Sequence, residues 1–511
     1  MTNFFHIFNL FGMIVVLEKN VMKLLLLDLN GLDSEINEPI NILTLESYLS
    51  HYLRFLDIDI KSNLLEDIKL IEYEQYDIIG ISSKIGSKDI LFQVIDKIYR
   101  LKKTIIVGNV LATYCYYSII KKFPKVICVR FEGEHSLLRL IENYCANKKS
   151  LDNNVLGNIP NLVYKKNGEI VATDIKTVAL DKYPIVLKKS LVKNVFDKQI
   201  LYRIEASRGC TWNNCTFCLV GEKYIKGYKT FDNRKIISEI ISANKIGIKK
   251  LFFTDEDFLG NDLSRIDALA NQITVLKLKN EIDANFSFFI STKANDIVNI
   301  YRIGLLKKII AAGFNDIFVG IESGSRTQLM RYCKGSSIKI NASSLKILKE
   351  FDIHIDIGFI FFDPLVTIEE LEENIEFIIE HLLSVTSARL IKPMLLSKSS
   401  LYYKKYRENV QFVSPVKDSI FIDYRFRKDI QPIYNKYFEY EQFLFKETNK
   451  IQYISRSMDN RYEMSLKELR YMDLMALKTI IKNINDKPNI MENNLNKLIQ
   501  NKKDIIKKIL G

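Results

Sequence analysis

The sequence predicts an α/β protein with three parts: an N-terminal Rossmann-like parallel sheet, a partial (β/α) barrel of the TIM type, and a mainly helical C-terminal region. Short apolar runs alternate with amphipathic segments of helix length from Met22 to about residue 148. The same alternation resumes after Leu201 and continues to about residue 400, beyond which the pattern is helical, aromatic and basic. We therefore expect a first domain at 22–148, a hairpin and linker at 149–195, a barrel at 196–400 and a helical region at 401–511.

The N-terminal part contains predicted strands at Lys23–Leu29, Asp77–Ser82, Thr104–Gly108 and Val126–Phe131, and predicted helices at Ile42–Phe55, Ile90–Leu101 and Ser136–Tyr144. Because the strands are near-continuous runs of Ile, Val and Leu separated by helices, they indicate a parallel sheet covered on both faces. Ligands bind beyond the carboxyl ends of such strands. Those ends carry small or polar residues here: Ser82, Ser83, Gly108, Asn109 and the turn Glu132-Gly133-Glu134.

Residues 149–195 interrupt this alternation of strands and helices. The dipeptide Asn167-Gly168 lies between two alternating runs, which predicts a β-hairpin. The segment around Tyr183-Pro184 is predicted to lead onward as a linker.

Six strand–helix units follow, about the number that a full or partial barrel needs. The predicted strands are Tyr202–Ala206, Lys250–Thr254, Asn285–Ile290, Asp316–Gly320, Ile355–Phe361 and Ala388–Ile391. The predicted helices between them are 233–246, 262–277, 299–312, 341–351 and 367–382. In this architecture too, functional residues lie at the carboxyl ends of the strands.

Composition limits the function classes. The formal net charge is +13, and residues 401–511 hold 22 Lys and Arg against 14 Asp and Glu. Because Lys, Ile and Asn are abundant throughout, we do not take this charge as evidence for nucleic-acid binding, and we interpret the C-terminal helices as solvated. The stretch Phe4–Leu17 is too short to span a bilayer and lacks the basic flank of a signal peptide. Residues 1–21 are either genuine or an extension ahead of a start at Met22.

The cysteines indicate one metal site in a reducing cytoplasm. Four of the seven stand alone, whereas Cys210, Cys215 and Cys218 share the loop SRGCTWNNCTFC after the first barrel strand. Three thiolates so close together indicate a soft metal. A structural zinc site needs a fourth ligand, and the next candidates along the chain are Cys333 and His354. An iron–sulfur cluster with one open iron fits three ligands better, with zinc and unligated thiols as alternatives.

This loop resembles the cluster loop of the radical S-adenosylmethionine (radical SAM) superfamily, in which three cysteines hold a [4Fe-4S] cluster. The usual spacing is x3 and x2, whereas this chain has x4 in the first gap. The resemblance implies reductive cleavage of SAM to a 5′-deoxyadenosyl radical, with an electron donor of the flavodoxin or ferredoxin type. It also places Phe217 against the adenine of SAM.

The ends of later strands match further family positions. By resemblance, Asp255 and Glu256 bind the SAM amino group. Ser291 and Lys293 end the third strand, where Lys293 takes the place of the arginine that the family more often has for contact with the SAM carboxylate. Glu322 and Ser323 belong to a Gly-rich turn that is similar to the family's ribose and carboxylate site; alone it could be a tight turn after a buried strand. Gly358 begins the fifth-strand motif, in which this chain has Phe362-Asp363-Pro364 where many relatives carry Gly-x-Pro-Gly-Glu.

The N-terminal sheet resembles the domain of the cobalamin-binding radical SAM subgroup, which implies cobalamin contacts from Ser82, Ser83, Gly108, Asn109 and Glu134. There is no Asp-x-His-x-x-Gly motif. His51 falls in a predicted helix and His135 at the start of one, so we expect no histidine on cobalt.

The resemblance implies cobalamin-dependent methylation of an unactivated carbon, with a peptide or natural-product intermediate as substrate. The alternatives are a cobalamin-free radical SAM cyclase, epimerase or methylthiotransferase. A remote alternative is a zinc-loop protein that binds nucleic acid through the Lys and aromatic residues of 402–440.

Overall fold

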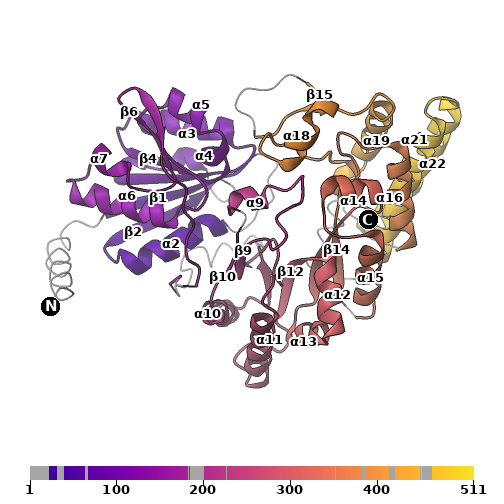
Figure 1. Ribbon diagram of the computed structural model, residues 1–511, viewed down its shortest axis with the longest axis horizontal. Helices are drawn as coiled ribbons and strands as arrows, with labels where there is room; N and C mark the ends of the chain where they lie inside the picture. Colours follow the sequence, from indigo (N-terminus) through magenta and orange to yellow (C-terminus); the bar gives the residue numbers. More distant parts are fainter. Residues whose placement is uncertain are drawn as a thin grey trace.

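The computed structural model describes ten ranges of the chain and one further residue: 22–31, 39–63, 67–181, 183–184, 201–225, 227–351, 353–381, 387–413, 420–448, 451 and 463–510. The expectations for residues 1–21, and for most of the linker that follows Tyr183-Pro184, lie outside these ranges. Figure 1 shows the N-terminal sheet, the barrel-like part and the C-terminal helices following one another across the molecule.

The N-terminal part is a seven-stranded sheet with the order β2-β1-β3-β4-β5-β6-β7. Its parallel strands are β1 (Met22–Leu29), β2 (Leu56–Ser62), β3 (Ile78–Ser83), β4 (Thr104–Gly108) and β5 (Ile127–Val129). This confirms the predicted parallel sheet, in a doubly wound order whose switch point lies between β1 and β3. The sequence pattern does not predict β2, because Asp57, Asp59 and Lys61 interrupt its apolar residues. As an edge strand, β2 tolerates these charges.

Helices cover both faces of this sheet. They are α2 (Ile40–Tyr52), α3 (Lys88–Tyr99), α4 (Asn109–Tyr114), α5 (Tyr116–Lys122), α6 (Glu134–Ala146) and α7 (Asn153–Leu156). Leu24 and Leu26 of β1 belong to one apolar cluster with residues of α2 and α6. Leu25 and Leu27 belong to a second cluster with residues of α3 and α5. Successive strand residues point to opposite faces, so the apolar run of β1 fills two cores.

The predicted hairpin forms, with β6 (Leu162–Lys166) and β7 (Glu169–Ala172) joined through Asn167 (φ 50°) and Gly168 (φ 90°). Positive φ at both positions is what a two-residue hairpin turn requires. β6 pairs antiparallel with β5, so the hairpin extends the N-terminal sheet.

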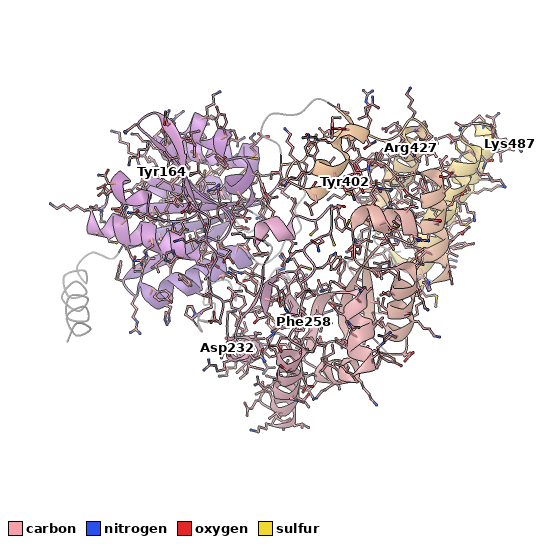
Figure 2. All side chains as sticks on the ribbon, in the orientation of Figure 1. Tyr164, Asp232, Phe258, Tyr402, Arg427 and Lys487 are labelled. Carbon is pink, nitrogen blue, oxygen red and sulfur yellow. The ribbon has the colours of Figure 1, made fainter. Side chains whose placement is uncertain are left out.

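The second part is a five-stranded parallel sheet with the order β14-β13-β12-β11-β8. Its strands are β8 (Arg203–Ile204), β11 (Lys250–Phe253), β12 (Ser287–Lys293), β13 (Asp316–Glu322) and β14 (His354–Phe359). The helices are α10 (Asn233–Lys245), α11 (Leu263–Leu278), α12 (Ala294–Arg302), α13 (Leu305–Ala312), α14 (Arg326–Tyr332), α15 (Ile338–Leu348) and α16 (Ile368–Glu380). The core includes Phe258, whose ring contacts Phe253 and Phe314 (Figure 2).

Two predictions for this part are wrong in detail. The helix expected at 299–312 is divided between α12 and α13 by Gly304, which has φ 74°. The sixth strand expected at Ala388–Ile391 is a helix, α17 (Ser387–Ile391), because a short apolar run does not by itself distinguish a strand from a buried helix. Arg389 of α17 donates to Asp356 at 2.6 Å and to the Ile357 carbonyl oxygen, so it satisfies polar groups of β14.

The C-terminal region is helical, as predicted, but it is more than a solvated cap. It contains α18 (Leu401–Tyr406), the short pair β15 (Gln411–Phe412) and β16 (Tyr424–Arg425), α19 (Gln431–Gln442), α21 (Glu463–Asn483) and α22 (Pro488–Leu510). Leu474, Leu477 and Ile480 of α21 belong to the same apolar core as the barrel strands. Among the described helices, we find none with the length and apolar character needed to cross a membrane.

Candidate active site

The three clustered cysteines lie on a loop that a small antiparallel ribbon closes. Its strands are β9 (Ser207–Gly209) and β10 (Tyr228–Thr230), and Gly209 pairs with Tyr228. Gly209 has φ 95°, and a Cβ there would lie 1.9 Å from the Gly227 carbonyl oxygen. Only glycine therefore allows the two strands to approach at the base of the loop.

Two of the cysteines form one tight turn. The Cys218 amide donates to the Cys215 carbonyl oxygen at 3.2 Å, and the Val220 amide donates to Cys218 Sγ at 3.4 Å. Burial raises the pKa of Cys215 to about 12, an effect that the Lys334 ammonium opposes. Burial also raises the pKa of Cys218. Binding of a metal would displace these thiol protons. In the described ranges, no group of three His, Cys, Asp or Glu side chains is gathered closely enough to hold a metal, so the cysteine ligands remain a prediction.

Asp257 fixes the end of the loop that carries Cys210. The sequence pattern does not indicate this role. The Asp257 carboxylate accepts hydrogen bonds from the amide (3.0 Å) and the hydroxyl (2.6 Å) of Thr211, which follows Cys210. Lys293 forms ion pairs with Asp257 and Asp296 and donates to the Thr211 hydroxyl at 2.6 Å. Lys293, the residue expected near the SAM carboxylate, is therefore already bound by protein groups.

The other predicted SAM contacts at the ends of β11 and β12 differ in accessibility. Asp255 is buried, and its two oxygens accept from the Ala206 amide (3.0 Å) and the Ser207 hydroxyl (2.5 Å). Burial raises the pKa of Asp255 to about 7. Asp255 therefore braces the chain before the cysteine loop. Glu256 is partly exposed and pairs with Lys223 at 3.2 Å, and Ser291 is half-buried on β12.

Glu322 lies at the end of β13 with φ 67°, and its carboxylate is 2.9 Å from Lys334 Nζ. Two glycines make room for this pair. A Cβ at Gly320 would lie 2.6 Å from Lys334 Nζ, and a Cβ at Gly358 would lie 3.2 Å from the Glu322 carboxylate. Gly358, one of the predicted site residues, thus leaves space for the Glu322 carboxylate. Lys334 is a cation beside Glu322 that the sequence pattern does not indicate.

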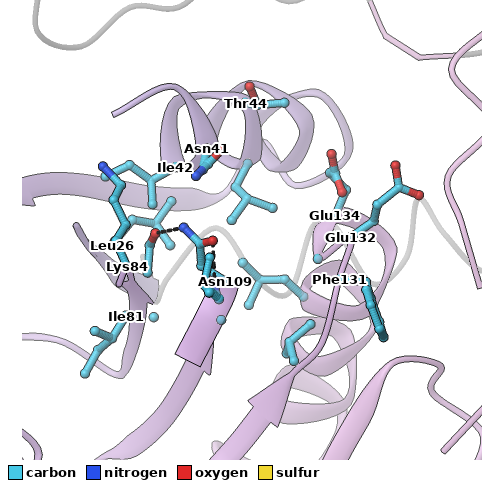
Figure 3. Close-up of a pocket in the computed structure, with 18 of the residues that line it drawn as sticks. Leu26, Asn41, Ile42, Thr44, Ile81, Lys84, Asn109, Phe131, Glu132 and Glu134 are labelled. Carbon is cyan, nitrogen blue, oxygen red and sulfur yellow. Dashed lines mark hydrogen bonds between the residues drawn. The ribbon is translucent and has the colours of Figure 1, made fainter. Parts of the chain in front are cut away.

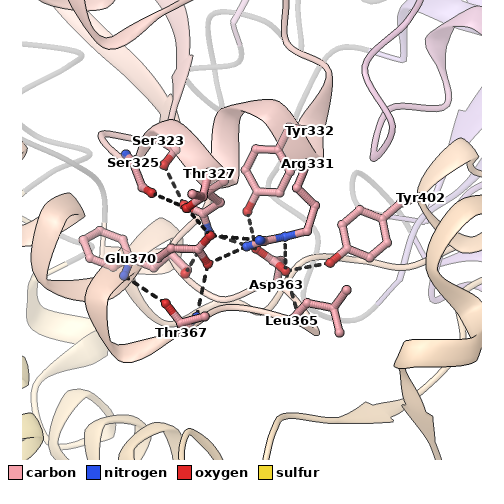
Figure 4. A network of polar contacts seen from close by, with 12 residues as sticks. Ser323, Ser325, Thr327, Arg331, Tyr332, Asp363, Leu365, Thr367, Glu370 and Tyr402 are labelled. Carbon is pink, nitrogen blue, oxygen red and sulfur yellow. Dashed lines mark hydrogen bonds and ion pairs between the residues drawn. The ribbon is translucent and has the colours of Figure 1, made fainter.

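The hydroxyl of Ser323, a predicted SAM contact, is bonded inside the protein. Its side chain is fully buried, and its hydroxyl lies 2.6 Å from Gln328 Oε1 and 2.8 Å from Asn374 Oδ1. It also accepts from the Ser325 amide at 2.9 Å. Ser323 therefore stabilises the turn from inside, within the polar network shown in Figure 4. Phe217 is half-buried, and its ring meets the Tyr332 ring edge-to-face with centroids 5.4 Å apart.

A cavity of about 530 Å³ lies at the carboxyl edge of the N-terminal sheet (Figure 3). Four predicted residues line it: Ser82, Gly108, Asn109 and Glu134. Ser83 does not, because it is buried and donates to the Gly108 carbonyl oxygen at 3.1 Å. The lining also contains apolar residues, among them Leu26 of β1 and Ile81 of β3, the two strands at the switch point. Histidine is absent from the described lining residues, and His51 and His135 are exposed on α2 and α6.

One wall of this cavity comes from the second part of the chain. Arg208 forms ion pairs with Glu132 (2.9 Å), Glu134 (2.7 Å) and Glu205 (3.0 Å), and its side chain is buried. Burial raises the pKa of Glu132, although Arg208 opposes this. The predicted residue Glu134 is thus an ion-pair partner in the cavity wall. Arg208 is two residues from Cys210, so it connects the cavity with the cysteine loop; only the fold reveals this connection.

Residues 204–378 match the family model of the Radical SAM superfamily, so this part of the chain is a radical SAM domain. The whole fold is similar to that of the cobalamin-dependent S-adenosylmethionine radical enzyme OxsB, with a TM-score of 0.80 and 20% identity over 98% of this chain and 81% of that chain. It is also similar to the radical S-adenosylmethionine methyltransferase TsrM from Kitasatospora setae (TM-score 0.59, 16% identity, 72% and 74% covered). The chain therefore has the fold of cobalamin-dependent radical SAM enzymes.

Three curated relatives are similar in sequence. The first is 4′-phospho-dehydrooxetanocin synthase of Priestia megaterium, with 28% identity over 67% of this chain and 49% of the relative. The second is anaerobic magnesium-protoporphyrin IX monomethyl ester cyclase of Cereibacter sphaeroides, with 24% identity over 53% of this chain and 43% of the relative. The third is bacteriochlorophyllide d C-8(2)-methyltransferase of Chlorobaculum tepidum, with 22% identity over 66% of this chain and 70% of the relative. The matched part of this chain spans about half the length of the first two.

Proposed function

We propose that this radical SAM enzyme binds cobalamin in the cavity of its N-terminal sheet and a [4Fe-4S] cluster on Cys210, Cys215 and Cys218. One observation carries the proposal: the cavity at the sheet edge is also lined by residues that flank the cysteine loop. Arg208 precedes Cys210, and Lys223 and Tyr224 follow Cys218 by a few residues. A ligand in the cavity would therefore contact the segment that carries the cluster.

The residues of the cavity suit a flat macrocycle. Gly108 has an extended backbone, and apart from its chain neighbours the nearest atom to a Cβ there would be the Val129 carbonyl oxygen at 4.0 Å. A ring can therefore approach the backbone at this point. Asn109 donates to the Ser82 hydroxyl at 3.0 Å, so two polar side chains are held at the same edge.

The cluster would supply the electron that cleaves SAM, and cobalamin would supply a carrier for a methyl group. The protein's own residues bind, orient and shield. Glu322 and Lys334, which pair with each other in this structure, offer opposite charges for the amino and carboxylate groups of SAM. Asp257 keeps Thr211 in place next to Cys210. The buried ion pairs of Arg208 close the cavity wall on the side of the cysteine loop.

Methyl transfer to an unactivated carbon is the reaction we propose. It is supported by the methyltransferase from Chlorobaculum tepidum and by the fold shared with TsrM. A second candidate is a reaction with another outcome, because the other two relatives are named a synthase and a cyclase. The substrate we propose is a peptide or natural-product intermediate, and the electron donor is of the flavodoxin or ferredoxin type.

The test is anaerobic purification and reconstitution with iron, sulfide and hydroxocobalamin, followed by incubation with SAM and a reduced flavodoxin. We expect 5′-deoxyadenosine, about four irons per chain and retained corrinoid. Deoxyadenosine without retained corrinoid would favour the cobalamin-free candidate. Stoichiometric zinc without SAM cleavage would contradict the proposal and favour the zinc-loop alternative.

Replacement of Glu322 by Ala is expected to weaken SAM binding roughly tenfold to a hundredfold, because a charge-assisted hydrogen bond contributes about 1.5–3 kcal/mol. Ser323→Ala should instead lower the melting temperature with little change in SAM affinity, since the Ser323 hydroxyl is bonded inside the protein. Equilibrium binding of SAM to the reconstituted protein and thermal melting separate the two effects. Unchanged SAM affinity in Glu322→Ala would return this turn to a purely structural role.

A further inference from the structure

A buried carboxylate lies next to the cysteine loop and has no role in the site described above. Asp363 follows β14, in the Phe-Asp-Pro stretch that departs from the family pattern, and it is fully buried. Its oxygens accept six hydrogen bonds. The donors are Arg331 Nε (3.1 Å) and Nη2 (2.8 Å), Tyr402 OH (2.6 Å), Tyr332 OH (2.9 Å), Gln328 Nε2 (2.9 Å) and the Leu365 amide (2.9 Å).

Asp363 is ionised in this setting. Burial opposes its charge, but Arg331 and the hydrogen bonds outweigh that effect and hold the pKa of Asp363 below its usual range. Arg331 also forms an ion pair with Glu370 at 2.6 Å, so its position is fixed from two sides (Figure 4). A fully buried charge is tolerated only when its partners are well placed. The geometry of the donors around Asp363 is therefore tightly determined.

Three of these donor residues hold one residue of the cysteine loop. Thr216, which follows Cys215, is buried. Its amide donates to the Tyr332 carbonyl oxygen at 2.8 Å, and its carbonyl oxygen accepts from the Tyr402 amide at 2.7 Å. Its hydroxyl donates to the Arg331 carbonyl oxygen at 2.9 Å. Every polar group of Thr216 is thus bonded to a residue whose side chain contacts Asp363.

Tyr332 and its neighbour Cys333 also contact the loop on both sides of Thr216. The Phe217 ring packs on the Tyr332 ring, and Trp212 Nε1 donates to the Cys333 carbonyl oxygen at 2.7 Å. Tyr402 belongs to α18, so the C-terminal region takes part in holding a loop nearly two hundred residues earlier in the chain. The bond from the Cys218 amide to the Cys215 carbonyl oxygen spans Thr216, so a shift of Thr216 would change the relative positions of both cysteines.

We propose that Asp363 is a positioning residue for the cluster: through Arg331, Tyr332 and Tyr402 it fixes Thr216 and thereby the spacing of Cys215 and Cys218. The inference rests on the proposed function, in that these cysteines hold a cluster. Asp363 touches neither cluster nor SAM in this role. It acts through the two tyrosines and the arginine.

The test removes single hydroxyl groups and leaves the carboxylate in place. Tyr332→Phe and Tyr402→Phe each delete one of six donors and keep the aromatic ring, so the fold should be retained. Tyr424→Phe is the matched control, because its hydroxyl donates to the Met394 carbonyl oxygen at 2.8 Å and not to Asp363. Two measurements are made on full-length protein: release of iron from the reconstituted cluster to a chelator, and alkylation of the cysteine thiols in the metal-free protein.

We expect iron release to be roughly tenfold faster in Tyr332→Phe and Tyr402→Phe, as the loss of one hydrogen bond to a charged group predicts. Alkylation of Cys215 and Cys218 should rise severalfold, while melting temperatures stay close to that of the wild type and Tyr424→Phe is unchanged. The reduced cluster with SAM should show altered electron paramagnetic resonance g values. Unchanged iron release and alkylation in both variants would overturn this inference alone. A wild-type protein that retains no cluster would overturn the proposed function as well.

Discussion

Replacement of Cys210, Cys215 or Cys218 by Ala is expected to abolish iron retention and SAM cleavage while leaving the fold intact. The reason is that three protein ligands are the minimum for a cluster with one open iron. The three side chains are only partly buried, so their loss removes little core. Iron and sulfide content, the visible absorbance of the reconstituted protein and far-UV circular dichroism measure these effects.

Cys333→Ala is the matched control, since Cys333 is the next cysteine along the chain and its carbonyl oxygen accepts a hydrogen bond from Trp212 of the loop. We expect it to keep both cluster and cleavage. Loss of bound metal in Cys333→Ala would indicate a fourth cysteine ligand and favour zinc. Retention of cluster and activity in any one of the three loop variants would show that the ligand assignment is wrong.

Gly108→Trp is expected to remove most bound corrinoid, to less than about a tenth of the wild-type content, and to spare the cluster. Gly108 lines the cavity, and its extended backbone accepts any side chain, so the substitution adds bulk without backbone strain. An indole at this position would occupy the surface that a macrocycle must approach. Corrinoid and iron per chain are measured on the same anaerobically reconstituted sample.

Gly108→Ala is the control for this variant, because a Cβ at residue 108 fits without a clash. Apart from its chain neighbours, the nearest atom to this Cβ would be the Val129 carbonyl oxygen at 4.0 Å. It should retain corrinoid at close to the wild-type level. Spectra of the wild-type cob(II)alamin form should lack nitrogen hyperfine structure from a protein imidazole, since His51 and His135 are exposed on helices. Full corrinoid content in Gly108→Trp would place the ligand elsewhere, and imidazole hyperfine structure would contradict the prediction about histidine.

The general architecture could be predicted from sequence because periodicity is a local property. The α/β fold class is confirmed, and the strand predicted at Thr104–Gly108 has the observed bounds of β4. The local pattern does not predict elements whose burial depends on distant neighbours. It does not indicate β2, which carries charges at the sheet edge. It predicts a strand at Ala388–Ile391, which lies in α17. The domain boundaries and the cysteine ligands stay predictions.

The order of the residues defines the chemistry available: three cysteines on one loop, a series of strand ends with small or acidic residues, and a sheet without a cobalt-binding histidine motif. Which of these groups are bonded to other protein groups depends on the fold. Ser323 and Asp255 are at the predicted strand ends, and both form hydrogen bonds inside the protein. Lys293 forms ion pairs with Asp257 and Asp296. The physical reason is that a side chain's accessibility depends on partners far away in the chain. Arg208 meets Glu132 across 76 residues, and Tyr402 meets Asp363 across 39, and no local spacing encodes either contact.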